Sequence, residues 1–353
     1  MSVTKVVKLD YLNIKEEIIR EAVEVLKSGG LVVIPTETVY GLAACALNKK
    51  AIEKLCEIKK RTINKPFSIA IDKIARVEEL AQDVPAAAYK LMAKFWPGPL
   101  TLILKGINQP SVGLRMPDDE IALKIISGLN CPVALPSANL SGMPAPQDFE
   151  AAFKDLNGLV ELAIDAGPVK LGVESTVVDL TSGTLRVVRP GAINDEEINK
   201  VIHKKHILFV CTGNTCRSVI AEALFKKMMR EQGRDDVEVY SAGVMTLSGI
   251  GASQAARTVL AREGMDASGH ISHEVTKEMA RRSDIILVME KLHEDAILKI
   301  APEVKNRVFL LKEFAKIEDN NPDISDPMGK PIDYYEQVFA TIKEALERVS
   351  RLI

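Results

Sequence analysis

The chain has 353 residues, 47% of them hydrophobic, and a formal net charge of −2 at pH 7. This length supports two folded domains, and the balanced charge excludes a polycation that binds nucleic acid over its whole surface. No apolar run approaches the ~20 residues of a membrane span, and the start has no hydrophobic signal segment, so we expect a cytoplasmic protein without a membrane partner. The five cysteines include no Cys-x2-Cys pair, so the sequence indicates neither a disulfide framework nor a metal site.

The N-terminal half alternates helical and strand-like patterns. The spacing of apolar residues predicts a helix over residues 14–26, which Ser28-Gly29-Gly30 ends. Short apolar runs predict strands over residues 31–34, 100–104, 132–135, 176–180 and 185–188. We therefore expect an α/β fold, with an open, twisted mixed sheet covered by helices.

Polar and cationic motifs follow several of these strands. Each one alone is typical of an ordinary turn or a solvated helix end, but together they place cations and hydroxyls at several edges of one sheet. That convergence predicts a site for a phosphate-bearing ligand. The residues concerned are Thr36, the basic cluster with Lys59, Arg61 and Lys65, then Arg115, Ser137, Asn139, Ser175 and Arg189.

Over about residues 5–200 these motifs resemble the Sua5/YciO/YrdC family, with its Lys-x-Arg signature at Lys59 and Arg61 and its Ser-x-Asn signature at Ser137 and Asn139. The resemblance implies synthesis of threonylcarbamoyl-AMP from L-threonine, bicarbonate and ATP, with Mg²⁺ on the pyrophosphate. A threonylcarbamoyl transferase complex then passes the group to adenosine 37 of tRNA, giving t6A.

The same resemblance implies roles for individual residues. ATP is held by Lys59, Arg61, Lys65, Ser137, Asn139 and Arg189, and threonine by Thr36, Arg115 and Ser175. The alternative is a noncatalytic RNA-binding module, because the concave surface of the family is also linked to double-stranded RNA. Retention of both signatures favours catalysis.

The two halves are expected to join near residue 203. Pro190-Gly191 and the residues after it end the first half, and a polar helix over residues 195–205 links the two, giving predicted domains 1–203 and 204–353. The second half reads β-α-β-α-α-β-α-β and closes with an amphipathic helix. This alternation predicts a doubly wound parallel sheet. The apolar face of the closing helix comprises Tyr335, Val338, Phe339, Ile342, Leu346 and Val349.

The segment Cys211-Thr212-Gly213-Asn214-Thr215-Cys216-Arg217-Ser218 lies between a predicted strand over 206–210 and a predicted helix over 220–225. A loop in that context offers free backbone N–H groups and a helix N-terminus to one phosphate group. The competing interpretation is a chance pattern, with Cys211 a small buried apolar residue. The glycine, asparagine and serine within the loop favour the phosphate site.

Side chains of the loop suit nucleophilic chemistry on phosphorus. Arg217 can hold two phosphate oxygens, and the positive field favours the thiolate of Cys211, to which the Ser218 hydroxyl can donate. Gly213 is expected to give the cradle its backbone freedom, and Asn214 to tie the loop to itself.

Displacement of a leaving group also requires a general acid, and the loop contains none. Asp326, in a Pro/Gly-rich segment before Pro327, is the favoured candidate on spacing alone. Asp323 and Asp319 compete for that role, and Asp326 could instead only turn the chain.

Residues 206–353 resemble the low-molecular-weight protein phosphatase family, which has a Cys-x5-Arg-Ser loop near its start and an Asp-Pro loop near its end. The resemblance implies a phosphocysteine on Cys211, phosphate binding by Arg217 and leaving-group protonation by Asp326, without a metal or other cofactor. The remaining loop residues, Thr212, Gly213, Asn214, Thr215, Cys216 and Ser218, line the phosphate.

Substrate choice within that family depends on the rim of the loop. Thr215 is similar to the residue of protein arginine phosphatases, which favours a phosphoarginine protein substrate, and phosphotyrosine remains the alternative. Val219, where proline is usual, and Met328, where an aromatic wall often stands, depart from the family pattern. Arsenate reductase shares the architecture but needs late cysteines, and this chain has none after Cys216.

Overall fold

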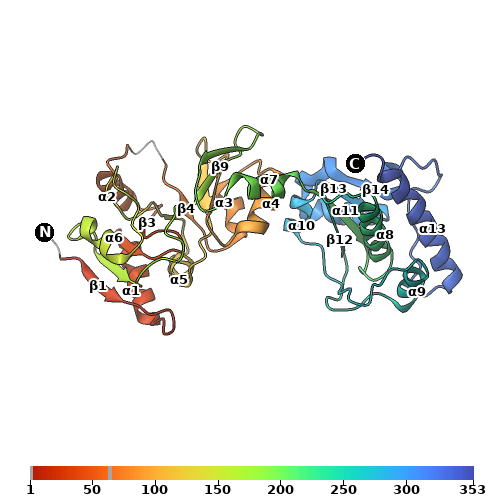
Figure 1. Cartoon of the computed structure of the whole chain (residues 1–353), viewed down its shortest axis with the longest axis horizontal. Coiled ribbons are helices and arrows are strands. Elements are labelled where there is room, and N and C mark those ends of the chain that lie inside the picture. The colour runs from red at the N-terminus through yellow and green to blue at the C-terminus, as the bar shows by residue number, and fades with distance from the viewer. Residues whose placement is uncertain (1–2, 63–65) are drawn as a thin grey trace. The chain divides into compact units, whose positions relative to one another are not determined.

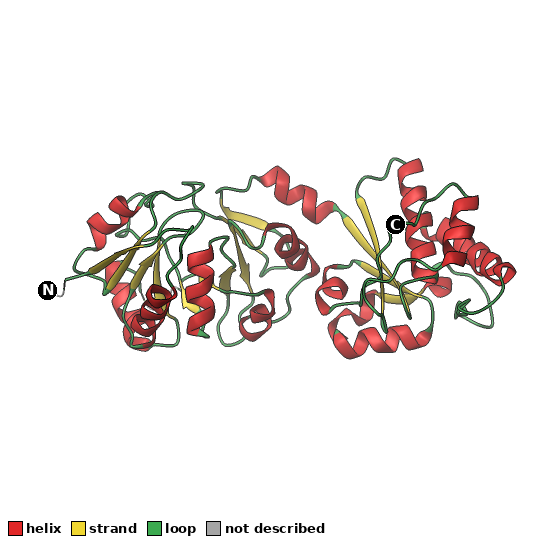
Figure 2. Ribbon diagram, turned by 90° about the horizontal axis from the view of Figure 1, so that it is seen from below, coloured by secondary structure: helices red, strands yellow, loops and turns green. Residues whose placement is uncertain are grey.

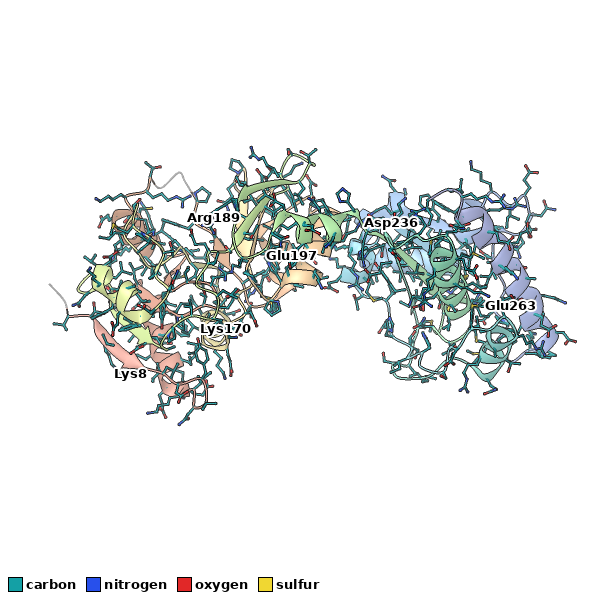
Figure 3. The ribbon with its side chains drawn as sticks, viewed as in Figure 1. Lys8, Lys170, Arg189, Glu197, Asp236 and Glu263 are labelled. Carbon is teal, nitrogen blue, oxygen red and sulfur yellow. The ribbon has the colours of Figure 1, made fainter. Side chains whose placement is uncertain are left out.

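The computed structural model of the chain describes residues 3–62 and 66–353. The chain divides into two compact units, Met1–Val201 and Ile202–Ile353, and each layers helices on strands (Figures 1 and 2). Charged side chains such as Lys8 of the first unit and Asp236 of the second lie on the outside of their own unit (Figure 3). In the described part of the chain, no helix is both long enough and apolar enough to cross a bilayer.

Unit 1 is built on a mixed sheet that, in its described residues, has ten strands in the order β1-β8-β2-β3-β7-β4-β6-β5-β9-β10. The strands are β1 (Lys5–Lys8), β2 (Val32–Ile34), β3 (Gly41–Cys45), β4 (Ile69–Ala70), β5 (Leu100–Leu104), β6 (Val112–Arg115), β7 (Val133–Ala134), β8 (Leu162–Asp165), β9 (Thr176–Asp179) and β10 (Arg186–Arg189). The helices are α1 (Glu16–Lys27), α2 (Lys49–Ile58), a 3₁₀ turn (Ile74–Arg76), α3 (Val77–Leu80), α4 (Ala86–Phe95), α5 (Glu120–Leu129), α6 (Phe149–Leu156) and α7 (Asp195–His203).

The core of unit 1 has an apolar layer on each face of this sheet. Along β2, Val32 and Ile34 pack with α1 and α5, whereas Val33 faces the opposite layer with α2 and α6. This alternation follows from the period of two along a strand. Because helices cover both faces of the sheet, a ligand can reach the sheet chiefly at the ends of its strands.

Side-chain caps fix where two of these helices begin. The Asn48 side chain accepts a hydrogen bond from the N–H of Ala51 at the start of α2, and Asp119 accepts one from Ala122 at the start of α5. The C-terminal end of α2 delivers Lys59, and Asp119 stands four residues after Arg115 at the end of β6.

Unit 2 contains a four-stranded parallel sheet, in its described residues, of order β12-β11-β13-β14, as predicted. The strands are β11 (Lys205–Cys211), β12 (Val237–Gly243), β13 (Ile285–Val288) and β14 (Val308–Leu310). The helices are α8 (Arg217–Glu231), α9 (Gln254–Arg262), α10 (Lys277–Arg282), α11 (Lys291–Ile300), a 3₁₀ turn (Pro302–Arg307), α12 (Leu311–Phe314) and α13 (Ile332–Val349).

The two faces of β11 carry different helical layers (Figure 1). Ile207 and Phe209 pack with α8, α9 and α13, whereas Leu208 and Val210 pack with α10 and α11. The strand order reverses direction at β11, which is where doubly wound sheets bind ligands at their carboxyl ends. Cys211 occupies that end.

Most predicted elements of both units are present, with shifted ends. All six residues predicted for the apolar face of α13 are buried. The linking helix was predicted to run to residue 205 but α7 ends at His203, because Lys205 already pairs with Val237 in the parallel ladder of β11 and β12.

Candidate functional sites

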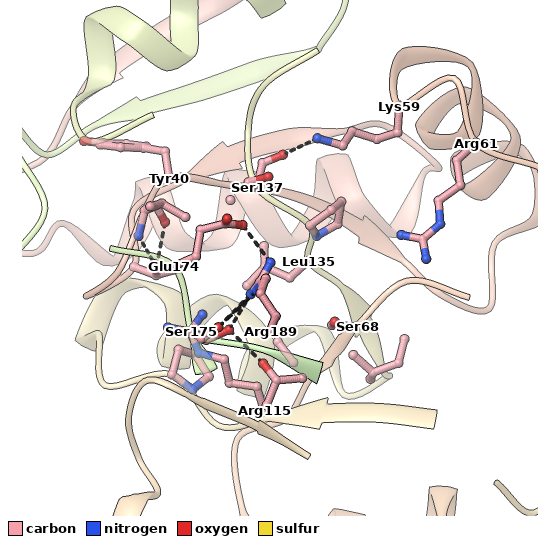
Figure 4. A pocket seen from close by; sticks show the side chains of 18 residues that line it. Tyr40, Lys59, Arg61, Ser68, Arg115, Leu135, Ser137, Glu174, Ser175 and Arg189 are labelled. Atoms are coloured by element: carbon pink, nitrogen blue, oxygen red, sulfur yellow. Dashed lines mark hydrogen bonds and ion pairs between the residues drawn. The ribbon is translucent and has the colours of Figure 1, made fainter. Parts of the chain in front are cut away.

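Unit 1 holds a cavity of about 190 Å³ at the strand ends (Figure 4). The lining includes seven of the nine residues predicted for ATP and threonine: Thr36, Lys59, Arg61, Arg115, Ser137, Ser175 and Arg189. Asn139 is not part of the lining but accepts a hydrogen bond from Lys59, and Lys65 falls outside the described residues. Segments far apart in the sequence therefore meet at one site.

Arg115 is held by the turn that follows β2. Its Nη2 lies 2.7 Å from Oε1 of Glu37 and donates to Oγ1 of Thr38 at 2.7 Å, while Nε donates to the carbonyl of Gly98 at 3.3 Å. Glu37 is only 3% exposed, so this carboxylate is buried beside its guanidinium partner. A guanidinium fixed in this way can present its remaining N–H groups to a ligand carboxylate.

Arg189 and Ser175 form a second wall of the cavity. Arg189 donates to Oε1 of Glu174 at 2.7 Å and to Oγ of Ser175 at 3.0 Å, and that hydroxyl lies 2.9 Å from Oγ1 of Thr101. Glu174 and Thr101 also line the cavity, and the sequence had not singled them out for a role. Little in the sequence indicated Thr101, because it lies inside a strand. It reaches the cavity wall only because β5 pairs with β9.

Lys59 connects the basic cluster to the Ser-x-Asn signature. Its ammonium donates to the carbonyls of Ser137 at 3.1 Å and Asn139 at 2.8 Å, and to Oδ1 of Asn139 at 2.8 Å. Burial lowers the pKa of Lys59 to about 8. The nearby Arg61 guanidinium stacks over the ring of Phe67. Thus Asn139 positions the lysine, and the lysine faces the cavity.

Thr36 lines the cavity with its hydroxyl already engaged in the turn. Its Oγ1 donates to the carbonyl of Val39 at 2.6 Å and accepts from the N–H groups of Thr38 and Val39. Among the described residues, Lys59, Arg61, Arg115 and Arg189 supply four cations to the cavity lining, against the one carboxylate of Glu174. This excess suits an anionic ligand.

In unit 2, Cys211 ends β11 and points its sulfur toward the first turn of α8. The Cys211 Sγ lies 3.0 Å from Oγ of Ser218, and both residues are buried. No acidic residue stands in the first turn of α8, and its N-cap has no side-chain hydrogen bond. The donors at this helix N-terminus are therefore available to an anion.

Asn214, not Gly213, supplies the unusual backbone conformation of the loop. Asn214 has φ of 52°, in the left-handed region, whereas Gly213 is not among the positive-φ residues. The Asn214 amide donates to Oγ of Ser218 at 3.0 Å and to Oγ of Ser241 at 2.8 Å. Asparagine tolerates this region and its side chain ties the loop to α8 and β12, so the role expected of the glycine falls to its neighbour.

Arg217 is 1% exposed and contacts two carboxylates. Nη1 donates to Oε2 of Glu290 at 2.5 Å and to the carbonyl of Ile324 at 2.7 Å, and Nη2 donates to Oδ2 of Asp326 at 2.7 Å. Its Nε is buried without a hydrogen-bond partner among the described residues. An unpaired buried donor is costly, and a phosphate oxygen in the loop would satisfy it.

The three candidate acids have different positions. Asp326 reaches Arg217, whereas Asp319 pairs with Lys312 at 2.6 Å and Asp323 accepts from the N–H of Lys291 at the start of α11. Only Asp326 of these three contacts a residue of the phosphate loop in the described structure.

Two residues at the start of α11, the N-cap Glu290 and His293 in the first turn, support the loop, and the sequence analysis did not identify them. Glu290 pairs with Arg217, and its own N–H donates to Nδ1 of His293 at 3.0 Å. Nε2 of His293 therefore carries the proton and donates to Oγ1 of Thr212 at 2.9 Å. Burial, reinforced by the Arg217 cation, lowers the pKa of His293 to about 4.

The strand β12 packs closely against the backbone of the phosphate loop. Gly243 at the end of β12 pairs with Cys211, and a Cβ added to it would lie 2.6 Å from the carbonyl of Thr212 and 2.9 Å from the nitrogen of Asn214. In the same loop, Sγ of Cys216 contacts Oγ of Ser253 at 3.2 Å.

Comparison with known proteins gives two matches along the chain. The Sua5/YciO/YrdC family model, described as telomere recombination, matches residues 24–191, and the model described as low molecular weight phosphotyrosine protein phosphatase matches residues 206–352. Among the described residues, no group of three or more histidine, cysteine, aspartate or glutamate side chains could hold a metal ion.

Curated relatives match the N-terminal part. A threonylcarbamoyl-AMP synthase of Pyrococcus abyssi is 42% identical over 206 residues, which cover 54% of this chain and 60% of the relative. A putative threonylcarbamoyl-AMP synthase of Mycobacterium tuberculosis is 38% identical over 192 residues, covering 51% of this chain and 87% of the relative. The chain thus spans about 60% of the length of the Pyrococcus relative.

One solved structure is similar to this chain. P. abyssi Sua5 complexed with L-threonine aligns with a TM-score of 0.55 at 26% identity, over 99% of this chain and 98% of that chain. The chain belongs to the Sua5/YciO/YrdC family through its N-terminal unit and to the low-molecular-weight protein phosphatase family through its C-terminal unit.

Proposed function

We propose that unit 1 forms threonylcarbamoyl-AMP from L-threonine, bicarbonate and ATP. The observation that carries the proposal is the convergence of Lys59, Arg115, Ser175 and Arg189 on one cavity. Arg115 holds the threonine carboxylate, and Lys59, Arg61 and Arg189 neutralise the phosphates, with Mg²⁺ on the departing pyrophosphate as part of the ATP substrate.

In this reaction, the threonine nitrogen first attacks the carbon of bicarbonate, a C–O bond breaks, and water leaves, giving a carbamate. A carbamate oxygen then attacks the α-phosphorus, a new P–O bond forms, and the bond to pyrophosphate breaks. Because no covalent intermediate is needed, alignment and charge neutralisation account for the catalysis. A transferase complex that modifies tRNA would consume the product.

Pyrophosphate release by the purified chain tests this proposal. Release should require both threonine and bicarbonate, and it should fall in Arg115→Ala. If the chain instead binds double-stranded RNA with no threonine-dependent pyrophosphate release, unit 1 is the noncatalytic RNA-binding alternative.

We further propose that unit 2 hydrolyses protein phosphoarginine. The observation that supports this proposal is a buried Arg217 with an unsatisfied Nε, in the same loop as a Cys211 thiol that lies 3.0 Å from the Ser218 hydroxyl. The Cys211 thiolate attacks phosphorus, the P–N bond breaks, and Asp326 gives its proton to the departing guanidine. Water then attacks the phosphocysteine with Asp326 as base, returning the thiolate and releasing phosphate.

The polar rim favours phosphoarginine over phosphotyrosine. Thr215 adds a hydroxyl to the phosphate loop that could hydrogen-bond to a guanidinium, whereas an apolar side chain would suit an aromatic ring better. Parallel hydrolysis of phosphoarginine and phosphotyrosine peptides by the full chain tests the assignment. A preference for phosphotyrosine would establish the alternative.

A further inference from the structure

A second hollow in unit 2, of about 690 Å³, is a groove along α8. One wall is a single face of that helix, because Val219, Glu222, Ala223, Lys226, Lys227 and Arg230 recur every three or four residues. The other wall is the segment over residues 264–271, which follows α9. The volume lies within the usual range for small-molecule sites.

Cations gather at the C-terminal end of the groove. Lys227 donates to the backbone carbonyl of Glu263 (labelled in Figure 3) at 3.0 Å, so no carboxylate neutralises it in that contact. Arg230 is exposed, and its guanidinium makes no hydrogen bond or ion pair to any described residue. Lys226 pairs with Glu222 one turn earlier.

The carboxylates of the groove have their oxygens engaged. Glu222 accepts from Lys226 with one oxygen and from Oγ of Ser241 with the other. Both oxygens of Asp266 accept from Ser268, one from its N–H and one from its hydroxyl. The groups of the groove that can still form hydrogen bonds are therefore mainly the N–H donors of Lys227 and Arg230, which suit an anion.

The opposite end of the groove carries apolar side chains and one imidazole. Val219 and Ile271 line it together with the imidazole of His270, whose Nε2 lies 2.8 Å from the carbonyl oxygen of Asn214. That contact places His270 beside the start of α8, whereas the Glu263 contact places Lys227 toward its end. Val219 and Arg230 are separated by about 16 Å along the helix axis.

We propose that this groove binds a nucleoside diphosphate or triphosphate. The ring system lies against His270, Val219 and Ile271, and the phosphates lie against Lys227 and Arg230. An aromatic base and a polyphosphate are the two parts that match an apolar end and a cationic end on one helix face.

Occupancy of the groove is coupled to the phosphate loop through both walls. His270 contacts the backbone oxygen of Asn214, and Glu222 reaches the Asn214 amide through Ser241. Asn214 is the left-handed residue of the loop, so a ligand that shifts either wall changes the alignment of the loop. This regulatory part rests on the proposed phosphatase activity, but binding itself does not.

Hydrogen exchange of the full chain, with ADP as the probe, tests binding. ADP should protect peptides from residues 219–230 and 264–271, which separates this groove from the cavity of unit 1. In Lys227→Ala/Arg230→Ala the dissociation constant from this protection should rise about tenfold or more, since two charge-assisted contacts are lost. Arg257→Ala on α9, an exposed arginine outside the groove lining, is the matched control.

Two comparisons decide the ligand. Adenosine and pyrophosphate should each protect the groove less than ADP, and equal protection by pyrophosphate would overturn the nucleotide assignment. Absence of ADP protection in both segments, or equal protection in the double variant, would overturn the site.

Hydrolysis of 4-nitrophenyl phosphate tests the coupling. ADP should change kcat in the full chain and leave kcat unchanged in Lys227→Ala/Arg230→Ala, whereas simple competition at the loop would move only KM. An unchanged kcat in the full chain would overturn the coupling. If the chain hydrolyses no phosphate ester, the proposed phosphatase function fails while the exchange result stands.

Discussion

Oδ2 of Asp326 accepts a hydrogen bond from Nη2 of Arg217 at 2.7 Å, although 109 residues separate them. The segment that carries Asp326 is thereby held over the loop that follows β11. A phosphate entering the loop competes for the same guanidinium, which would release the carboxyl group toward the leaving atom.

Replacement of Asp326 should remove general acid catalysis. In Asp326→Asn we expect kcat for phosphopeptides to fall by about 10²–10⁴-fold, measured by phosphate release. The loss should be smaller for 4-nitrophenyl phosphate, whose leaving group needs less protonation. Asp319→Asn, at an acid that pairs with Lys312, is the control and should retain activity; wild-type turnover in Asp326→Asn would contradict the assignment.

The two active sites should be separable. Cys211→Ser should abolish phosphatase activity, because the nucleophile is lost, and leave threonine-dependent pyrophosphate release intact. Lys59→Ala or Arg61→Ala should have the opposite pattern. Both assays on each variant check this, and loss of both activities in any one variant would refute independent sites.

Thr215 should influence the choice of leaving group. Thr215→Val keeps the shape of the side chain and removes the hydroxyl. One lost hydrogen bond of about 1 kcal/mol corresponds to about a fivefold fall in kcat/KM for phosphoarginine peptides. The ratio to phosphotyrosine peptides should shift accordingly, and an unchanged ratio would show that the rim threonine does not select the substrate.

His293 should make unit 2 less stable in acid. Its pKa is about 4 in the folded chain against 6.5 for the free side chain. Between these values the unfolded state binds the proton and the folded state does not, so stability falls as the pH drops from 6.5 toward 4. From pH 7 to pH 5 the loss is about 2 kcal/mol.

Native-state hydrogen exchange of β11 and β13 peptides measures this effect in unit 2 alone. His293→Asn should reduce the pH dependence, whereas His273→Asn, at an exposed imidazole, should not. An equal pH dependence in wild type and His293→Asn would contradict the prediction.

ATP affinity should fall in alkaline solution because of Lys59. The folded pKa of about 8 means that the ammonium is charged below that pH and loses its charge as the pH rises above it. The lowered pKa also means that charged Lys59 reduces the free energy of unfolding below pH 8. This loss of stability diminishes as the pH rises from 8 toward 10.5. Calorimetric titration of ATP from pH 7 to pH 9.5 should show the decline in wild type, and Lys59→Arg should remove it. A parallel decline in both proteins would assign the effect to another group.

The phosphate loop could be predicted because its information is local. Cys211, Arg217 and Ser218 lie within eight residues, and a strand before and a helix after them bring their side chains to one place. The sequence predicted that Gly213 would give the loop its backbone freedom, whereas the residue in the left-handed region is Asn214. The structure shows Asn214 there because side-chain bonds to Ser218 and Ser241 hold it, and β12, which carries Ser241, is distant in sequence.

Support from distant elements could not be predicted. Glu290 and His293 reach the loop because β13 pairs with β11, so α11 begins beside Arg217. In unit 1, β3 was missed because Gly41–Cys45 is buried on both faces and has no alternation. The partnership of Lys59 with Asn139 likewise depends on the folded sheet, although both residues were identified separately.

Because Gly243 has no side chain, β12 can pack directly against the loop over residues 211–218. Any larger residue at this position would collide with the backbone of Thr212 and Asn214. It would distort the loop backbone although every side chain of the loop would still be present. The shape of the loop in unit 2 thus depends on its own eight residues and also on a position 25 residues after Ser218, where the structure leaves no room for a side chain.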